Sequence, residues 1–551
     1  MESRRNKDRT VREDGKPDRA RTGRMAAEQM KKEKAAPGKA QEGREKPVQG
    51  KADRPKTEKA APGKARTGRE NPGQGKAEMS KKEQLKPEKL SKKKSRCPVS
   101  ALCGGCTMID VPYEDQIQGK QKVLEELIGE FVTPDPFIRM KAPEHYRHKV
   151  TSVFAPDYRG RPVCGIYREG THEVIPVKSC LIEHIQADRI IQTIFRLLAD
   201  FRIRVYDEDM DRGLLRYVQI RAARATKEIM VTLVLTDPVL PSRNTFVKKL
   251  VKLHPEITTI VINVNDRNTT MILGNRETVI YGRGYIEDVL CGKRFRISSR
   301  SFYQVNPLMT EKLYNIAIDC AALSGKETVL DTYCGIGTIG IIAAPLARRV
   351  IGVELNAEAV RDAQQNIRMN GLTNVEILQG DATRFMMELA AAHGDHIAAG
   401  QENSGSAVSG KIFTGKPGKG VLTESEEGIP VKSWEGLLME TEESIPAQSW
   451  ESLFPVPGED TPDILSPDAL PGNVDVIFMD PPRSGSTEDF MRAACTLRPK
   501  KIVYISCSPW SLQRDLAFFT QNGYSVRKAI PVDMFPFTGG IETVVLLTHN
   551  V

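Results

Sequence analysis

The chain has 551 residues, of which 40% are hydrophobic, with a formal net charge of +9 and a mean hydropathy of −0.37. This length predicts about two to four domains. No apolar run reaches the roughly 18 residues of a membrane-spanning helix, and the opening MESRRNKDRT has no apolar stretch of the kind that marks a secretory signal. We therefore expect a cytoplasmic protein with no membrane partner, whose ten cysteines are thiols or metal ligands rather than disulfides.

Residues 1–95 are predicted to be a disordered, basic, low-complexity tail. Residues 1–96 contain 31 Lys and Arg against 15 Asp and Glu and have few large apolar side chains. Such a segment cannot bury enough surface to offset its chain entropy. KAAPGKAQEGREKPVQGKAD (34–53) returns as KAAPGKARTGRENPGQGKAE (59–78) after 25 residues. The composition fits both a polycationic arm for RNA phosphates and a solubilising tail.

A cysteine-cluster segment, residues 96–140, follows the tail. Its stretch CPVSALCGGC has the pattern C-x5-C-x2-C, formed by Cys97, Cys103 and Cys106. A tetrahedral site needs a fourth thiolate, for which Cys164 and Cys180 are the candidates. Zinc and an iron–sulfur cluster both accept four thiolates, so the pattern predicts a metal site and leaves the metal open.

Residues 141–298 are predicted to form a β-rich domain. Short runs of alternating polar and apolar residues, rich in β-branched side chains, are separated by turn residues. The runs are HKVTSVFA, EVIPVK, LRYVQIRAA, EIMVTLVL, TTIVINVN and TTMILGN. This pattern is typical of a largely antiparallel sheet.

Residues 299–551 change to alternating strand and helix patterns. The pattern runs through ETVLDTYCGIGTIGIIAAPLA, RRVIGVEL, AVRDAQQNIRMNG and VEILQGDA, and it resumes at VDVIFMDPPRSG, KKIVYISCSP and ETVVLLTHN. It predicts a doubly wound, Rossmann-like α/β domain.

Residues 391–473 interrupt this domain with 4 Lys and Arg against 14 Asp and Glu. The stretch EEGIPVKSWEGLL (426–438) returns as EESIPAQSWESLF (442–454). Because long structureless segments are unusual inside a compact core, we predict a disordered surface insertion. The Trp434 and Trp450 repeats fit a neutral tandem duplication better than two partner-binding motifs.

A cofactor site is predicted where the first strands of the α/β domain end. VLDTYCGIGTIG ends a strand at Asp331 and continues with a glycine-rich turn, which lets backbone amides approach a ligand. The next strand ends at Glu354, where a carboxylate suits the two hydroxyls of a ribose. This spacing fits a dinucleotide as well as S-adenosylmethionine. Asp381 after a third strand and Asp480 in DPPRSG after a fourth favour the methyl donor, because DPPR is similar to motif IV of methyltransferases that act on nucleic acids.

Cys507 and Glu542 are the candidate catalytic residues. YISCSP places Cys507 at a strand tip, and strand tips of a doubly wound sheet converge on the ligand. Carbon 5 of uracil is too weak a nucleophile to take a methyl group unaided. A thiolate that adds to C6 makes C5 nucleophilic, and a base must then remove the C5 proton. Glu542, at the start of the last strand, is the candidate base.

The motifs FYQVN (302–306), DTYCGIG, DPPRSG, ISCSP and GGIET together resemble the RNA uracil-C5 methyltransferase family. The resemblance covers residues 97–551 apart from the insertion. It implies a class I methyltransferase domain that follows a β-rich RNA-binding domain, with Cys507 as nucleophile and Glu542 as base. It also implies that five residues contact the cofactor or the target base: Gln304, Tyr333, Glu354, Asp381 and Asp480. Thr338 stands where many members have an asparagine that contacts the cofactor.

The resemblance also bears on the cysteines. Family members that modify ribosomal RNA carry a [4Fe–4S] cluster on C-x5-C-x2-C and a later cysteine, which KSCLIEH matches with Cys180. This implies Cys97, Cys103, Cys106 and Cys180 as ligands of a cluster with a structural or RNA-positioning role. It favours a monomeric 23S rRNA enzyme over the tRNA branch, although residues 1–95 show no strand pattern for the small β-barrel that many rRNA members have.

Two other classes of function remain open at this stage. The glycine turn and the cysteines together fit an NAD-linked iron–sulfur oxidoreductase, although this leaves DPPRSG, ISCSP and Glu542 unexplained. A non-catalytic RNA-binding protein is the second alternative, against which the intact nucleophile and base argue.

Overall fold

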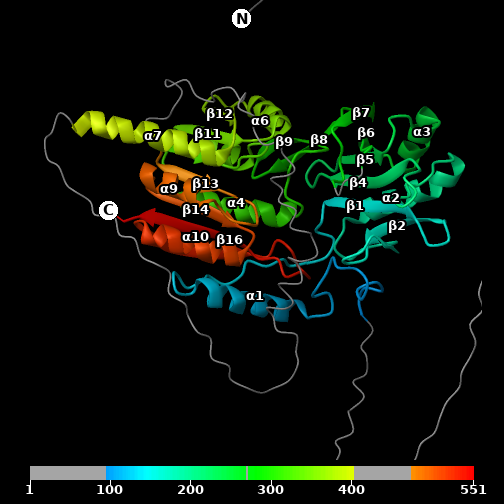
Figure 1. The fold of residues 1–551 in the computed structure, drawn as a ribbon, viewed down its shortest axis with the longest axis horizontal. Helices are drawn as coiled ribbons and strands as arrows, with labels where there is room; N and C mark the ends of the chain where they lie inside the picture. The colour runs from blue at the N-terminus through cyan, green and yellow to red at the C-terminus, as the bar shows by residue number, and fades with distance from the viewer. Residues whose placement is uncertain (1–94, 268–270, 402–472, 551) are drawn as a thin grey trace, which may run out of the picture. The chain divides into compact units, whose positions relative to one another are not determined.

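The computed structural model describes residues 95–267, 271–401 and 473–550 (Figure 1). The predicted tail and most of the predicted insertion lie outside these residues. The described residues belong to one compact unit, residues 90–551. Within the described part of the chain, no helix is long and apolar enough to cross a membrane.

Two seven-stranded sheets and one hairpin organise the chain (Figure 1). The first half contains α1 (Tyr113–Ile128), β1 (Lys149–Pro156), β2 (Pro162–Tyr167), β3 (Val174–Pro176), α2 (Ile185–Asp200), β4 (Leu215–Ala222), β5 (Ile229–Leu235), α3 (Arg243–Leu253), β6 (Ile257–Val264), β7 (Arg276–Tyr281), β8 (Tyr285–Leu290) and β9 (Lys293–Ser298). The second half contains α4 (Pro307–Ala321), β10 (Thr328–Asp331), α5 (Thr338–Ala343), the short 3-10 helix η1 (Ala344–Leu346), β11 (Arg349–Glu354), α6 (Ala357–Met369), β12 (Val375–Gln379), α7 (Ala382–Gln401), β13 (Val476–Met479), α9 (Glu488–Leu497), β14 (Lys501–Ser506), α10 (Pro509–Gln521), β15 (Tyr524–Val532) and β16 (Glu542–His549).

The first sheet has the order β3-β2-β1-β4-β5-β6-β7. Most neighbours pair antiparallel, which confirms the predicted largely antiparallel sheet, and β5 and β6 form a parallel pair within it. The reason is α3, which lies between β5 and β6 in the chain and supplies the crossover that a parallel pair needs. Apolar side chains of α2 and α3 pack on one face of the sheet in a shared core with Val150, Ile220 and Ile260.

The predicted strand TTMILGN (269–275) is wrong for residues 271–275, which form no strand, since β7 begins only at Arg276. Residues 269–270 lie outside the described part of the chain. This segment is held by the side chains of Asn263, in β6, and Asn265, directly after it, and not by the main-chain hydrogen bonds of a strand. The Asn265 side chain donates to the carbonyls of Met271 (2.6 Å) and Ile272 (3.2 Å). The Asn263 side chain donates to the Gly274 carbonyl (3.0 Å) and accepts from its N–H (2.7 Å).

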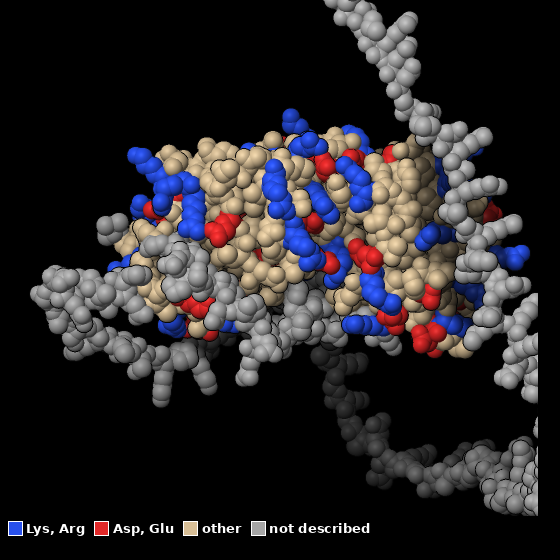
Figure 2. All heavy atoms as spheres, turned by 90° about the horizontal axis from the view of Figure 1, so that it is seen from above, with Lys and Arg blue, Asp and Glu red and all other residues tan. Residues whose placement is uncertain are grey.

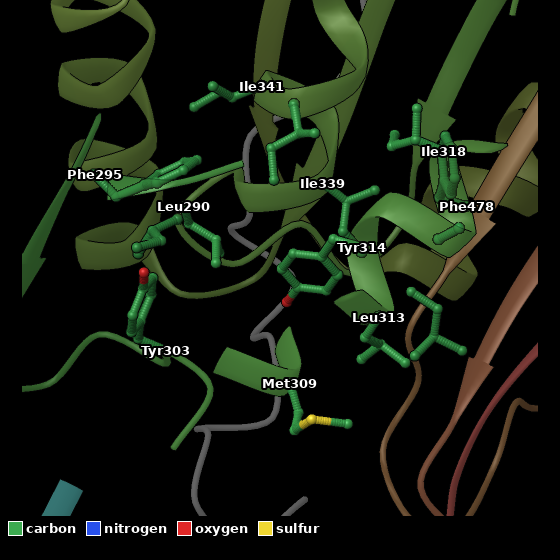
Figure 3. Packing of buried hydrophobic residues seen from close by; sticks show 14 of the residues in the cluster. Leu290, Phe295, Tyr303, Met309, Leu313, Tyr314, Ile318, Ile339, Ile341 and Phe478 are labelled. Carbon is green, nitrogen blue, oxygen red and sulfur yellow. The ribbon is translucent and has the colours of Figure 1, made fainter. Parts of the chain in front are cut away.

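The β8–β9 hairpin was predicted as part of the β-rich domain, but it contacts α6 of the α/β domain. The Arg294 and Arg296 N–H groups donate to the side chains of Asn370 (3.0 Å) and Asn366 (2.7 Å). Figure 3 shows Leu290 and Phe295 of the hairpin near Tyr303, and all three belong to the large core around α4.

The second sheet has the order β12-β11-β10-β13-β14-β16-β15. Strands β10 to β14 are parallel, and β16 pairs antiparallel with both β14 and β15. Consecutive strands run outward in one direction from β10 to β12 and in the other from β13, which creates a switch point between β10 and β13. This confirms the doubly wound prediction.

Both faces of the second sheet are covered. Val329, Phe478 and Val503 point into the core that α4 and α5 fill. The neighbouring positions Leu330 and Ile477 point into a second core, which also holds residues of α1, α7, α9 and α10. Strands buried on both faces explain the nearly continuous apolar runs in the sequence.

The predicted insertion begins too early. Residues 391–401, assigned to it, continue helix α7. The Ala-rich stretch LAAAH in this region has strong helix propensity. The polar composition of the residues that follow it hides this preference in the sequence pattern.

The cysteine-cluster segment contains a helix that the pattern did not reveal. Helix α1 packs beside α10, as Figure 1 shows, and contributes Val123, Leu124 and Ile128 to the second core. The segment is therefore tied to the α/β domain as well as to the cysteines.

Candidate active site and cysteine cavity

The glycine turn lies between β10 and α5. Gly335 and Gly337 have φ values of +56° and +81°, a backbone region that disfavours other residues. The Gly340 N–H donates to Oδ2 of Asp331 (2.9 Å). A Cβ at Gly340 would lie 3.2 Å from the same oxygen and 3.0 Å from Val350, so the helix approaches the strand closely only with glycine here.

Asp331 offers a free acceptor at this turn. It is 1% exposed, and its Oδ1 has no hydrogen-bond partner among the described residues. Burial, and to a smaller extent Glu354, raise its pKa to about 7 despite the Gly340 bond. A buried carboxylate oxygen without a donor fits a ligand that brings a positively charged donor, such as the amino group of S-adenosylmethionine.

Glu354 lies at the tip of β11, where the sequence predicted it. Its two oxygens accept from the N–H groups of Gly335 (3.0 Å) and Asn356 (2.7 Å). Burial raises its pKa, and these backbone bonds oppose the shift. The bonds fix the carboxylate beside the glycine turn.

Tyr333 and Asp381 lie on the same side of this turn. The Tyr333 ring packs against Phe490 with centroids 5.6 Å apart. Burial raises the pKa of Tyr333 to about 12, and Asp381 contributes to the shift. Asp381 also caps α7, since its Oδ1 accepts from the Arg384 N–H (2.8 Å).

Gln304 and Thr338 are placed by α4 and α5. Gln304 is partly exposed in the loop before α4, and the neighbouring Val305 carbonyl accepts from the His148 N–H of the β-rich region (2.7 Å). Thr338 begins α5 and lies close enough to Tyr314 to oppose the rise that burial causes in the pKa of its hydroxyl. Figure 3 shows Tyr314 beside Ile339, next to this helix start.

The DPPRSG loop after β13 is held by α10. The Ser486 N–H donates to Oδ2 of Asp515 (2.9 Å), and Arg514 donates to the carbonyls of Ser484 (2.9 Å) and Ser486 (3.0 Å). Asp515 is fully buried and also accepts from the Tyr504 hydroxyl (2.8 Å). No sequence motif predicts these supports, because the residues that form them are distant in the chain.

Cys507 and Glu542 meet across the end of the β14–β16 ladder. Ser506 pairs with Thr543, so the next positions outward are Cys507 and Glu542. Opposite residues of an antiparallel pair have Cα atoms about 4.5–5.5 Å apart. The antiparallel direction of β16 therefore brings together two residues that are 35 positions apart in the sequence.

Charged neighbours surround the Cys507 thiol. Burial, Glu542 and Asp480 raise its pKa, while Arg483 lowers it. Burial and Asp480 raise the pKa of Glu542, which is 2% exposed, and Arg483 again opposes the shift. Burial and Asp331 raise the pKa of Asp480 to about 7. Arg483, which the sequence analysis passed over within DPPR, is the cation that favours the charged forms of both candidate catalytic residues.

The four predicted metal ligands border one cavity of about 50 Å³. Cys97, Cys103, Cys106 and Cys180 all line it, together with Glu183 and Asp188. Cys164, the other candidate for the fourth ligand, does not line it. It is buried and accepts from the Gln192 side chain (3.5 Å).

The thiols of this cavity act on one another. Burial, followed by Cys180, Cys103 and Cys97, raises the pKa of Cys106 to about 12. Burial and then Glu183 raise the pKa of Cys180 to about 12. In the described ranges, no group of three or more His, Cys, Asp or Glu side chains has the arrangement to hold a single metal ion, so the four thiols border the cavity without converging on one point.

Surface charge does not mark a single phosphate-binding patch on the face shown in Figure 2, where Lys and Arg lie among Asp and Glu. Several arginines around the β8–β9 hairpin pair with carboxylates. The pairs are Arg283–Glu228, Arg283–Glu287, Arg294–Glu287, Arg296–Asp362 and Arg300–Glu358.

Comparison with known proteins identifies the family. The sequence pattern of the tRNA (uracil-5-)-methyltransferase family matches residues 112–394 and 471–550. The chain belongs to this family. It is an S-adenosylmethionine-dependent RNA methyltransferase, so the oxidoreductase and non-catalytic alternatives are not supported.

Relatives of this methyltransferase match most of its length. It is 34% identical over 456 residues to an uncharacterised RNA methyltransferase of Halalkalibacterium halodurans, which covers 82% of each chain. A Bacillus cereus RNA methyltransferase is 33% identical over 463 residues, 83% of this chain and 84% of the relative. The fold is similar to the Pyrococcus abyssi tRNA (uracil-54, C5)-methyltransferase in complex with S-adenosyl-L-homocysteine, with a TM-score of 0.56, 19% identity and 81% and 86% of the two chains covered.

The two parts of the family match bracket residues 395–470, which fall in the region predicted as an insertion. The match begins after Cys106, so the C-x5-C-x2-C segment lies outside it. Three of the four cavity cysteines therefore lie outside the family match, whereas Cys180 lies within it.

Proposed function

We propose that this methyltransferase transfers a methyl group to C5 of a uridine in 23S rRNA through a covalent adduct on Cys507. The observation that carries the proposal is the meeting of Cys507 and Glu542 at the end of the β14–β16 ladder. A thiol opposite a buried carboxylate provides a nucleophile and a base on the two sides of one reacting carbon–carbon bond.

The proposed roles follow from the bonds that must form and break. The Cys507 thiolate adds to C6 of the uracil, which leaves the electron pair at C5. S-adenosylmethionine, when bound, supplies an electrophilic methyl group to that carbon. The Glu542 carboxylate then takes the proton from C5, the C5–C6 double bond re-forms, and the thiolate leaves. Arg483 favours the thiolate and the carboxylate by its charge.

The proposed cofactor contacts lie along one sheet edge. Glu354 suits the ribose hydroxyls, and Tyr333 with Asp381 lies where the adenine would stack. Gln304, Thr338 and Asp480 are proposed to contact the methionine part or the target base. These assignments come from the family resemblance and from the convergence of the strand ends.

The cysteine cavity is proposed to hold a [4Fe–4S] cluster on Cys97, Cys103, Cys106 and Cys180. Four thiols around one cavity support this ligand set over one that includes Cys164. Iron bound there would favour the thiolates, whose charge burial opposes. No proton or methyl transfer above depends on it, so its proposed role is structural.

The choice of 23S rRNA rests on the resemblance to cluster-bearing rRNA enzymes. We also propose that the enzyme acts as a monomer. The Pyrococcus abyssi enzyme with the similar fold is named for a tRNA substrate, so tRNA is the competing outcome of the test.

The test is methylation of 23S rRNA and tRNA in vitro, both from cells that lack the gene, followed by mass-spectrometric mapping of 5-methyluridine. We expect the modification in 23S rRNA and none with Cys507→Ala. Modification of tRNA alone would overturn the rRNA assignment. Methylation by Cys507→Ala would overturn the covalent mechanism.

A further inference from the structure

The loop that leads into Glu542 is held by the cysteine-cluster segment and its surroundings. This loop, residues 533–541, joins β15 to β16. Four consecutive carbonyl groups in it each accept a hydrogen bond from a different distant residue. The pairs are Met534 with the Asn306 side chain (2.9 Å), Phe535 with Lys120 Nζ (3.2 Å), Pro536 with the Tyr146 hydroxyl (3.1 Å) and Phe537 with the Met108 N–H (3.0 Å).

The start of the loop carries a buried ion pair. Lys120 Nζ lies 2.7 Å from Oδ1 of Asp533, and both side chains are fully buried. The Tyr113 hydroxyl donates to Oδ2 of Asp533 (2.7 Å). Because α1 supplies both donors, this helix fixes the position and orientation of the Asp533 carboxylate.

The middle of the loop is held in an unfavourable backbone conformation. Phe537 is fully buried with φ of +65°, which non-glycine residues rarely adopt. Its N–H donates to Oε1 of Gln116 (2.8 Å), and its carbonyl accepts from Met108. Gln116 in turn donates to the carbonyls of Met108 (3.2 Å) and Val111 (2.8 Å). Glu542 follows Phe537 by only five residues, and Met108 follows Cys106 by two.

These contacts exceed what a loop needs to connect two strands. The β15–β16 ladder ends at the pair of Val532 with Glu542, and the loop directly connects these two residues. Tyr146 lies close to both regions, since its hydroxyl donates to the Pro536 carbonyl and is near Cys106 and Cys180.

We propose that residues 108–146 act as a support that positions Glu542 opposite Cys507, with Lys120 as the positioning residue of this support. The inference rests on the proposed role of Glu542 as the base. The segment after the cysteines thereby contributes to the reaction without contacting RNA.

The test uses the full-length protein with both partners of the ion pair neutralised, Lys120→Met together with Asp533→Asn. This avoids leaving one charge buried without its partner. Displacement of a reacting group by about 1 Å can reduce the rate about 10²-fold. We therefore expect kcat to fall about 10- to 100-fold, with the affinity for S-adenosylmethionine and the KM for RNA within about threefold of the wild type. Because proton removal follows methyl transfer, the methylated enzyme–RNA adduct should accumulate on denaturing gels, as it should with Glu542→Gln.

The matched control is Lys122→Met on the same helix, whose side chain is 72% exposed and which should behave as the wild type. If the double variant fails to bind S-adenosylmethionine, Tyr146→Phe provides the same readout, since it removes one donor to the loop and little volume. A folded double variant, or Tyr146→Phe in its place, with wild-type kcat and no adduct would overturn the inference.

Failure of the proposed function would look different. RNA that contains 5-fluorouridine has no C5 proton to remove, so the wild type and both variants should all form the adduct with it. Absence of that adduct in the wild type would reject the Cys507 mechanism rather than the support of Glu542.

Discussion

The molecule contains two thiol sites, and both have carboxylates beside buried sulfur. At the cysteine cavity, Glu183 raises the pKa of the Cys180 thiol, and at the strand ends Glu542 does the same to Cys507, in each case after burial. The difference lies in the number of thiols, because a cation opposes the pKa shift at both sites, Arg147 at Cys106 and Arg483 at Cys507. Four cysteines share one cavity, whereas Cys507 stands without another described thiol among its main electrostatic neighbours and is influenced by Arg483. Burial is common to both sites and therefore does not distinguish a candidate metal ligand from a candidate nucleophile. The number of neighbouring thiols does.

The largest expected effect comes from the strand-end thiol. Cys507→Ala should abolish methyl transfer because it removes the thiolate that adds to C6, while iron content and S-adenosylmethionine affinity stay unchanged. A tritium-transfer assay, iron analysis and calorimetric titration measure these three quantities. Loss of iron in Cys507→Ala would show that the two thiol sites do not act independently.

The base opposite this thiol should give a large effect as well. Glu542→Gln should lower kcat by about 10²- to 10⁴-fold, the usual contribution of a positioned base. The adduct should persist, because its formation needs only the thiolate. Rapid quench with labelled RNA checks this. Unchanged turnover would show that another group takes the C5 proton.

Substitution of a cysteine in the cavity should change the metal content of the protein and not the chemistry of methyl transfer. Cys180→Ser should reduce the iron of anaerobically purified protein from about four atoms per chain toward zero and remove the broad visible absorbance. Cys164→Ser, at a buried thiol outside the cavity, is the matched control and should retain both. Equal iron loss in both variants, or stoichiometric zinc in the wild type, would contradict the assigned ligand set.

A smaller effect is expected in the pH dependence of methyl transfer. The pKa values of Cys507 and Glu542 are both raised, and both groups must lose a proton to act, so kcat/KM should rise with pH between about 6 and 9. Arg483→Ala removes the charge that favours both deprotonated forms, so the profile should shift to higher pH by about half a unit to one unit. A pH–rate profile of the two proteins measures the shift. An unshifted profile would show that Arg483 does not favour the deprotonated form of Cys507.

The smallest expected effect lies beside the cavity. The Cys180 N–H donates to Oδ2 of Asp188 (2.8 Å), which orients the loop that carries this cysteine. Asp188→Asn keeps an acceptor oxygen, so iron content should stay near the wild type while the cluster is lost faster on exposure to air. The decay of visible absorbance over time measures this. Complete loss of iron would show that the carboxylate itself holds the metal.

The order of strands and helices in the α/β domain, and the residues at the strand tips, could be predicted from the sequence. Strands buried on both faces produce long apolar runs, and strand ends carry residues such as Asp331, Glu354 and Cys507, so a local pattern is sufficient. The sequence also identified the cysteine pattern, because three cysteines in ten residues are conspicuous without any knowledge of the fold.

Tertiary structure alone decided which distant residues meet. The antiparallel direction of β16 puts Glu542 opposite Cys507, and the cavity wall includes Cys180 and excludes Cys164. The parallel β5–β6 pair, the turn at 271–275 and the contacts of α1 with the 533–541 loop likewise arise from packing between segments far apart in the chain. Such contacts depend on long-range geometry, which periodicity and spacing within a short stretch do not encode.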